Sequence, residues 1–217
     1  CIGIGTGIKL AVFPLHIWLP NAYTYAPAIV TAFLAATATK VSYYVLVRFI
    51  FSVFGVDLAF GLRFDAVLMP LAIAAMFAGS TVAIFQNDIK RMLAYSSVAQ
   101  IGYMVLGIGL ATAAGVSASV LHLFNHALMK GALFLALGAV IYRIGSGNLR
   151  DLAGLGWRMP WTTAAIVIGG LSLIGVLDIS KVYMLPTFLL PMAVGGLLFG
   201  VGMALGGWMF GRRADRS

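Results

Sequence analysis

The sequence predicts an all-α fold, a polytopic bundle of transmembrane helices, and three observations support this class. Hydrophobic residues make up 62% of the 217 residues and charged residues only 9%, a balance that soluble domains do not have. Long apolar runs recur along the chain and are separated by short segments with Gly, Pro and charged residues. No linker is long enough to separate domains, so residues 1–217 are predicted to form a single transmembrane domain.

Seven apolar runs give the predicted elements in chain order. A helix rises about 1.5 Å per residue, so roughly twenty apolar residues cross a bilayer. Every run after the first has a usable spanning length, with 161–177 at the short limit, so about six to seven spans are predicted. The runs cover residues 1–13, 27–54, 66–86, 91–113, 115–142, 161–177 and 184–210.

The first run is predicted to belong to a discontinuous helix that is broken near Pro14. Proline cannot donate a backbone hydrogen bond and its ring crowds the preceding turn, so the break frees backbone acceptors near Lys9. Broken helices at mid-membrane form ion sites in many transporters. The alternative is that Pro14 ends a helix and that Lys9 extends its amine to the membrane surface; these residues alone favour neither.

The distribution of Lys and Arg predicts the orientation, because cytoplasmic loops carry more basic residues. With alternating spans, one side receives only Arg48, Arg63 and Lys181. The other, richer side is therefore predicted to face the cytoplasm, in the inner (plasma) membrane. It receives Lys90, Arg91, Arg143, Arg150, Arg158, Arg212, Arg213 and Arg216.

The chain has few acidic residues and one cysteine, and this composition excludes several kinds of site. The chain has no Glu, and its six acidic residues are all Asp at or beyond the ends of apolar runs. The single cysteine, Cys1, cannot form a disulfide or a Cys-based metal site within the chain. No phosphate loop, His-Glu metal pair or Ser/His/Asp set is present, so no catalytic, cofactor or metal site is predicted. The net charge of +8 follows the loop pattern and does not indicate nucleic-acid binding.

A basic stripe lies inside the run 115–142. His122, His126 and Lys130 are the only residues of that run that can carry positive charge. Their i, i+4, i+8 spacing places them on one helical face, with Ser119 one turn earlier. A helix of this length extends roughly 42 Å, so Lys130 falls near mid-membrane. Ionisable residues at that depth are costly and indicate a function by default.

Three lysines, Lys9, Lys40 and Lys130, are predicted to lie deep in the membrane. Each costs about 2.5–3.5 kcal/mol on insertion scales. Burial and mutual repulsion favour the neutral amine, so these lysines can exchange protons that His122 and His126 relay through water. The five groups, at similar depth, would form a proton relay along the membrane plane. The alternative is packing: a lysine bonded to a carbonyl, and core histidines with satisfied hydrogen bonds.

Other polar residues are candidates for supporting roles. His16 follows the break and is predicted either to face water where protons enter the relay or to bond a loop carbonyl. Asp88 stands where a helix N-cap is expected, which explains it without chemistry. A polar patch in the following span would hold water near the relay or bond neighbouring helices. It consists of Ser96, Ser97, Gln100 and Tyr103.

Three segments, residues 9–22, 88–103 and 122–135, together resemble one known family. They contain Lys-Leu-Ala-Val-Phe-Pro-Leu-His-Ile-Trp, Asp-Ile-Lys-Arg-Met-Leu-Ala-Tyr-Ser-Ser and His-Leu-Phe-Asn-His-Ala-Leu-Met-Lys. These motifs are similar to the proton-conducting antiporter-like subunits of respiratory NADH:quinone oxidoreductase and of multisubunit cation/proton antiporters. The resemblance covers about residues 1–176. The third segment and residues 148–156 look closest to the D-type subunit of the antiporter.

The resemblance implies a fold of two inverted repeats, with lysines at the positions of Lys9, Lys40 and Lys130 on a hydrated central axis. It also implies that Lys9 pairs with a glutamate on an earlier helix. The chain, which begins at Cys1, is therefore expected to be a fragment of a larger fold. The resemblance ends at an irregular junction near Val176, where a second broken helix with a Lys or Glu is expected. Either residues are missing there or the protein is truncated.

The predicted function is proton translocation through the Lys/His relay, as part of a multisubunit cation (Na+)/proton antiporter with other membrane subunits as partners. One alternative is an antiporter-like proton-pumping subunit of a respiratory NADH:quinone oxidoreductase or a membrane hydrogenase. Another is a truncated scaffold that packs against partner subunits and conducts nothing. The chain itself is predicted to be a transporter subunit, so in a redox-driven complex the redox chemistry would belong to other chains.

Overall fold

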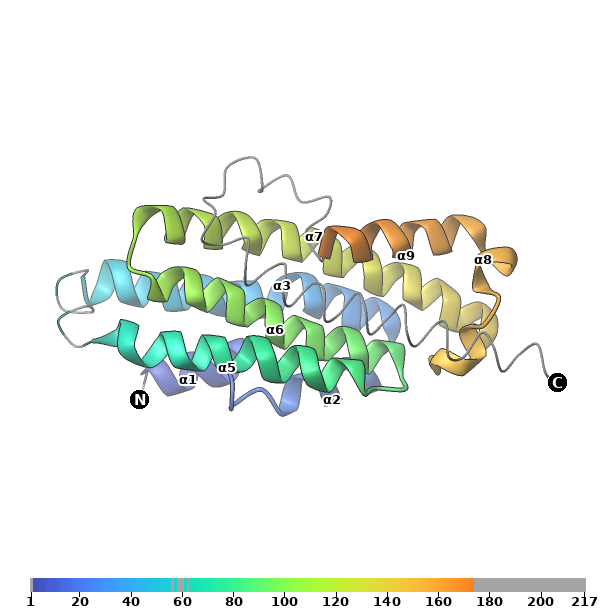
Figure 1. The fold of residues 1–217 in the computed structure, drawn as a ribbon, viewed down its shortest axis with the longest axis horizontal. Helices are drawn as coiled ribbons and strands as arrows, with labels where there is room; N and C mark the ends of the chain where they lie inside the picture. The colour runs from blue at the N-terminus through green and yellow to red at the C-terminus, as the bar shows by residue number, and fades with distance from the viewer. Residues whose placement is uncertain (1, 56, 58–60, 62, 174–217) are drawn as a thin grey trace.

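The computed structural model describes residues 2–55, 57, 61 and 63–173 (Figure 1). The predicted run 184–210, the junction near Val176 and Lys181 lie outside these residues. The elements are α1 (Ile2–Leu10), α2 (Trp18–Tyr25), α3 (Ala28–Arg48), the π-helix η1 (Phe49–Val53), α5 (Phe64–Ile84), α6 (Ile89–Gly109), α7 (Ala113–Ile144), the 3-10 helix η2 (Leu149–Leu152), α8 (Leu155–Arg158) and α9 (Pro160–Leu173).

The predicted helical bundle is confirmed. Within the described residues, four helical segments are long and apolar enough to cross a membrane, and α9 is a shorter apolar helix. The four segments are Ala28–Val53, Phe64–Ile84, Ile89–Gly109 and Ala113–Ile144. Each matches a predicted apolar run to within a few residues, because the apolar stretches themselves set the helix lengths.

The first helix is discontinuous, as its proline predicts. α1 ends at Leu10, and α2 begins at Trp18 after a cis peptide bond between Phe13 and Pro14. The indole Nε1 of Trp18 donates a hydrogen bond to the carbonyl oxygen of Ile8 at 2.7 Å. That carbonyl lies in the last turn of α1, where acceptors lack their usual helical donors. Trp18 therefore connects the two halves of the broken helix.

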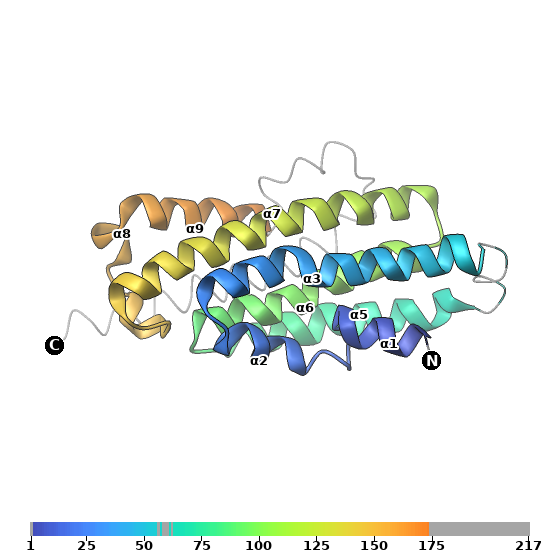
Figure 2. The ribbon, with the colours of Figure 1, turned by 180° about the vertical axis from the view of Figure 1, so that it is seen from behind.

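α6 is the central helix of the bundle (Figures 1 and 2). Nearly all its residues are buried, and it packs against α5, α7 and α2. Glycine permits its close contact with α5: a Cβ atom on Gly102 would lie 2.8 Å from the carbonyl oxygen of Ala72. A Cβ atom on Gly79 would likewise lie 2.8 Å from the backbone nitrogen of Ala99. Any side chain at these two positions would push the helices apart.

The loop before α6 meets the segment after α7. The backbone N–H of Ile89 donates to Gly147 at 3.0 Å, and that of Leu149 donates to Asn87 at 2.9 Å. The predicted N-cap is confirmed, because the Asp88 carboxylate accepts from the backbone N–H of Arg91 at 2.9 Å. Two of the loops assigned to the basic side of the membrane therefore share one end of the bundle.

Candidate functional site

One face of α7 carries four buried polar side chains, here called the polar row: Ser119, His122, His126 and Lys130. Each is 1% exposed or less, so the predicted stripe does form one buried face. The row points into the core, where α7 packs against α3 and α6. From Ser119 to Lys130 the helix rises about 16 Å. The row therefore extends along α7 as well as across the bundle.

α6 supplies the acceptors for Lys130. The ammonium Nζ donates to the carbonyl oxygen of Leu93 at 2.6 Å and to the hydroxyl oxygen of Ser96. Hydrogen bonds to a charged group contribute about 1.5–3 kcal/mol each, so the two offset part of the cost of burying the charge. The hydroxyls of Ser96 and Ser97 also both donate to the carbonyl oxygen of Leu93 within their own helix, at 3.0 and 3.1 Å. Of these two predicted patch residues, Ser96 is the one that contacts the row.

The next turn of α6 fixes the orientation of His122. Its Nε2 lies 2.5 Å from the amide oxygen of Gln100, while the amide Nε2 of Gln100 donates to the carbonyl oxygen of Leu173 at 3.4 Å. Because the amide nitrogen faces a carbonyl, the amide oxygen is the group available to accept, which places a hydrogen on His122 Nε2. The ring of Tyr103 meets the His122 ring edge-on, with centroids 6.2 Å apart.

His126 is fully buried next to the other members of the polar row. Its ring stacks on that of His122, with centroids 6.1 Å apart and planes inclined by 16°. The charges of Lys40 and Lys130 both act on it. Neither ring nitrogen has a hydrogen-bond partner within the described part of the chain. Buried polar atoms are nearly always satisfied, so two ring nitrogens without a partner among the described residues are unusual.

Lys40 approaches the row from α3. It is 7% exposed, and its ammonium donates to the carbonyl oxygen of Ala35 in its own helix. Thr37 and Ser42 also carry hydroxyls near Lys40 in the sequence of α3. These two hydroxyls bond carbonyls one turn back in α3, as serine and threonine in helices commonly do.

A hydroxyl pair stands at the far end of the row. Tyr43 of α3 bonds the hydroxyl of Ser119, and that hydroxyl lies 2.5 Å from the carbonyl oxygen of Met104 in α6. The pair joins α3, α6 and α7 in one place. Sequence analysis placed Ser119 on the face but not its partner, because the contact depends on how α3 and α7 align.

Lys9 and His16 lie away from this buried cluster. Lys9 is exposed on α1, whereas Lys40 and the polar row are buried. His16 lies half-buried in the break, stacked on Phe13 at 5.4 Å and edge-on to Tyr95 of α6 at 6.4 Å. The structure thus brings together four of the five predicted relay residues, and the roles of Lys9 and His16 stay predictions.

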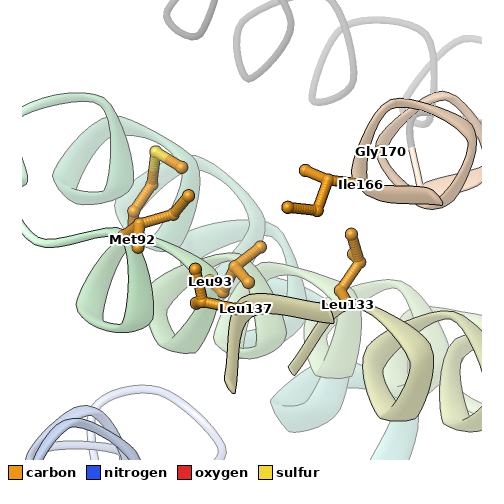
Figure 3. A pocket seen from close by; sticks show the side chains of 7 residues that line it. Met92, Leu93, Leu133, Leu137, Ile166 and Gly170 are labelled. Carbon is orange, nitrogen blue, oxygen red and sulfur yellow. The ribbon is translucent and has the colours of Figure 1, made fainter. Parts of the chain in front are cut away.

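Leu93, whose carbonyl accepts the hydrogen bond of Lys130, lies among apolar side chains on the side that faces α9 (Figure 3). A cavity of about 20 Å³ lies between α6, α7 and α9. This volume is close to the minimum for one water, and a cavity without polar partners stays empty. Water is therefore not expected to reach the row from this side. The lining residues are Ile89, Met92, Leu93, Leu133, Leu137, Ile166 and Gly170.

Several known proteins are similar to this chain. The N-type subunit of the NADH-quinone oxidoreductase of Desulforudis audaxviator (strain MP104C) is 45% identical over 172 residues, covering 79% of this chain and 34% of the relative. The D-type subunit of the Na(+)/H(+) antiporter of Alkalihalophilus pseudofirmus is 34% identical over 173 residues, covering 80% of this chain and 34% of the relative. The chain therefore spans about a third of the length of these relatives.

Solved structures agree with this similarity. A chain of the Mrp complex from Dietzia sp. DQ12-45-1b superposes with a TM-score of 0.80 at 29% identity, covering 94% of this chain and 40% of that chain. A chain of the membrane-bound sulfane sulfur reductase, an archaeal respiratory membrane complex, gives a TM-score of 0.84 at 29% identity, with 94% and 44% covered.

The match to a family extends over most of the sequence. The family described as NADH:quinone oxidoreductase/Mrp antiporter, TM, matches residues 1–205, past the last of the motifs. The helical fold, the discontinuous helix and the relatives all agree with that match. The chain belongs to the NADH:quinone oxidoreductase/Mrp antiporter family, as an antiporter-like membrane subunit.

Proposed function

We propose that this subunit carries protons through Lys40, His122, His126 and Lys130. The single observation that carries the proposal is His126, which is fully buried, is acted on by the charges of Lys40 and Lys130, and has both ring nitrogens unbonded in the described residues. A neutral imidazole can accept a proton on one nitrogen and release one from the other. Water on either side of the ring would complete a path from one amine to the next.

Like-charge repulsion couples the protonation of the two lysines. Lys40 and Lys130 act on one another electrostatically, so protonation of one amine disfavours protonation of the other. A proton that arrives at Lys40 therefore favours release from Lys130, with His126 between them. Ser96 and the carbonyl of Leu93 stabilise Lys130 while it holds the charge.

Lys9 would act as the switch that starts this movement. It is exposed on α1, so its charge is available to a carboxylate from another helix or another chain of the complex. Formation of that ion pair would remove positive charge from the end of the relay. The carboxylate would come from an earlier helix or from one of the other membrane subunits that are expected as partners in the inner (plasma) membrane.

Two kinds of complex fit a protein of this kind. A multisubunit Na+/H+ antiporter fits the antiporter relative from Alkalihalophilus pseudofirmus, which is 34% identical. The higher identity of 45% to a component of an NADH-quinone oxidoreductase supports a redox-driven complex as the second candidate. The identity of co-purifying chains would separate them: flavin or iron–sulfur proteins would support the second, and small hydrophobic proteins alone the first.

Lys130→Ala in the assembled complex tests the proposal. Proton translocation per assembled complex is expected to fall at least about tenfold, since removing one catalytic acid–base group costs roughly 10²–10⁴-fold in comparable proton transfers. Leu128→Ala is the matched control, because Leu128 is on the same helix and 60% exposed. Unchanged translocation in Lys130→Ala would reject the relay and favour a scaffold that conducts nothing.

A further inference from the structure

Lys90, in the first turn of α6, holds the end of the broken helix. Its Nζ donates to the carbonyl oxygens of Thr24 at 2.9 Å and Ala26 at 2.6 Å, at the C-terminus of α2. The last carbonyls of a helix lack intrahelical donors and carry partial negative charge, so an ammonium is favourable there. Lys90 therefore connects α2 directly to α6, which is more than a loop charge on the cytoplasmic side needs to do.

A second contact holds the same joint without involving α6. The hydroxyl of Thr31, in the first turn of α3, lies 3.1 Å from the carbonyl oxygen of Tyr23 and 3.3 Å from that of Ala26. Thr31 is fully buried. The end of α2 is thus connected to α3 through Thr31 and to α6 through Lys90, and the two connections can be removed separately.

On α6, Lys90 is close to the acceptors of Lys130. Leu93 and Ser96 follow it by about 4.5 and 9 Å along the helix axis. α6 is buried over almost its whole length, and close-packed interiors transmit displacement. A movement of the first turn of α6 therefore changes the positions of both acceptors relative to Lys130.

On the other side, α2 is connected to the turn that carries Lys9. The hydrogen bond from Trp18 to Ile8 joins the start of α2 to the end of α1 at 2.7 Å. Lys9 is the residue after that acceptor. A change at Lys9 can therefore reach α2, and α2 reaches α6 through Lys90.

We propose that Lys90 is a positioning residue that transmits movement of the broken helix to the acceptors of Lys130. The inference rests on the proposed function, because it assigns Lys9 and Lys130 to one transport cycle. When the pairing of Lys9 changes, α1 and α2 shift together. Lys90 moves the first turns of α6, and Leu93 and Ser96 then hold the ammonium of Lys130 more or less tightly.

A double-mutant cycle on proton translocation by the assembled complex in membrane vesicles tests this link. Lys90→Met removes the hydrogen bonds from α6 to the end of α2, Thr31→Val removes the hydroxyl contacts from α3 to the end of α2, and Lys9→Arg perturbs the broken helix while keeping its charge. We expect Lys90→Met to lower translocation per assembled complex by about two- to thirtyfold, the range that substitutions along coupled networks produce.

The double variants distinguish two roles of Lys90: transmitting movement from α2 to α6, and only holding the end of α2 in place. Lys90→Met with Lys9→Arg should translocate at the rate of the slower single variant, because the hydrogen bonds through which the effect of Lys9 is proposed to reach α6 are already removed. Thr31→Val with Lys9→Arg should instead show the product of the two single effects. If Lys90→Met does not assemble, Lys90→Gln takes its place in the same cycle. Glutamine removes the charge but keeps an amide NH2 group that can donate.

Two results would overturn the inference: full translocation by the Lys90 variant, or effects that multiply in its double variant with Lys9→Arg. Lys130→Ala distinguishes this failure from failure of the proposed function. Unchanged translocation in Lys130→Ala rejects the polar row itself. If the effects of the Lys90 variant and Lys9→Arg multiply while the Lys130→Ala variant is slow, only the link through Lys90 is rejected.

Discussion

Lys130 has none of its surface exposed, and the hydrogen bonds that hold its ammonium come from one neighbouring helix. The carbonyl of Leu93 and the hydroxyl of Ser96 lie on the same side of α6, one turn apart. A carbonyl oxygen can only accept hydrogen bonds, whereas a hydroxyl group can rotate and donate one. The Ser96 hydroxyl is therefore the part of this site that can adjust when the amine loses its proton.

Ser96→Ala should slow proton translocation while leaving the fold intact. The substitution removes one of two charge-assisted hydrogen bonds, worth about 1.5–3 kcal/mol, so we expect translocation per assembled complex to fall about tenfold. Ser42→Ala is the control, because Ser42 is also buried and its hydroxyl donates to the carbonyl of Ala38 within α3. Equal rates for the two variants would contradict the assignment of Ser96.

His126→Leu should separate transport from stability. It replaces a buried ring, whose two nitrogens have no protein partner among the described residues, by an apolar side chain, so no hydrogen bond to those residues is lost and an apolar group costs less to bury than an imidazole. We expect translocation to fall at least about tenfold while the thermal unfolding temperature of the assembled complex stays equal or rises. A destabilised variant that still translocates would identify His126 as an ordinary core histidine.

At this scale the sequence predicted the stripe but not its bonds. The spacing of His122, His126 and Lys130 was enough to place them on one buried face, because helical pitch is fixed. The partners of Lys40 and Lys130 were not predictable in the same way. A carbonyl acceptor such as that of Leu93 leaves no mark in a sequence, and its choice depends on how far α6 and α7 slide past one another.

The elements of the bundle are held at short distances by small residues. α5 and α6 approach so closely at Gly102 that a Cβ atom there would lie 2.8 Å from the carbonyl of Ala72 and 2.9 Å from the side chain of Met76. α6 in turn carries the acceptors of the polar row. The packing of α5 therefore bears on the position of those acceptors.

Gly102→Ala should destabilise the bundle by forcing α5 and α6 apart. Overpacking of this kind costs about 1–3 kcal/mol, so thermal unfolding of the assembled complex should occur at a lower temperature. Gly5→Ala is the matched control, since a Cβ atom on Gly5 would meet nothing within 4 Å, and alanine in a helix interior is favoured over glycine. If both variants unfold at the temperature of the wild type, the close contact at Gly102 is not required.

Element boundaries were largely predictable, whereas local irregularities were not. Apolar runs and the break at Pro14 come directly from residue types. The π-helix Phe49–Val53 and the short helices η2 and α8 lie where the run of apolar residues continues or where loop residues are mixed. Hydrophobicity does not distinguish a turn of α-helix from a turn of π-helix, so these details could be seen only in the structure.

The whole molecule joins a broken helix, a central helix and a buried polar row into one unit. The charges of the row are all basic, and the Asp residues of the described part stand outside its spans or at their ends. We expect carboxylates from other helices or other chains to balance this positive charge. The similar depth of the five relay groups in the membrane stays a prediction. The polar row itself rises about 16 Å along α7.

A map of the assembled complex at a resolution that shows ordered water tests the central claim most directly. The account predicts water within hydrogen-bonding distance of both ring nitrogens of His126, continuing toward Lys40 on one side and Lys130 on the other. A dry His126, packed against apolar side chains with no water between it and either lysine, would contradict the relay.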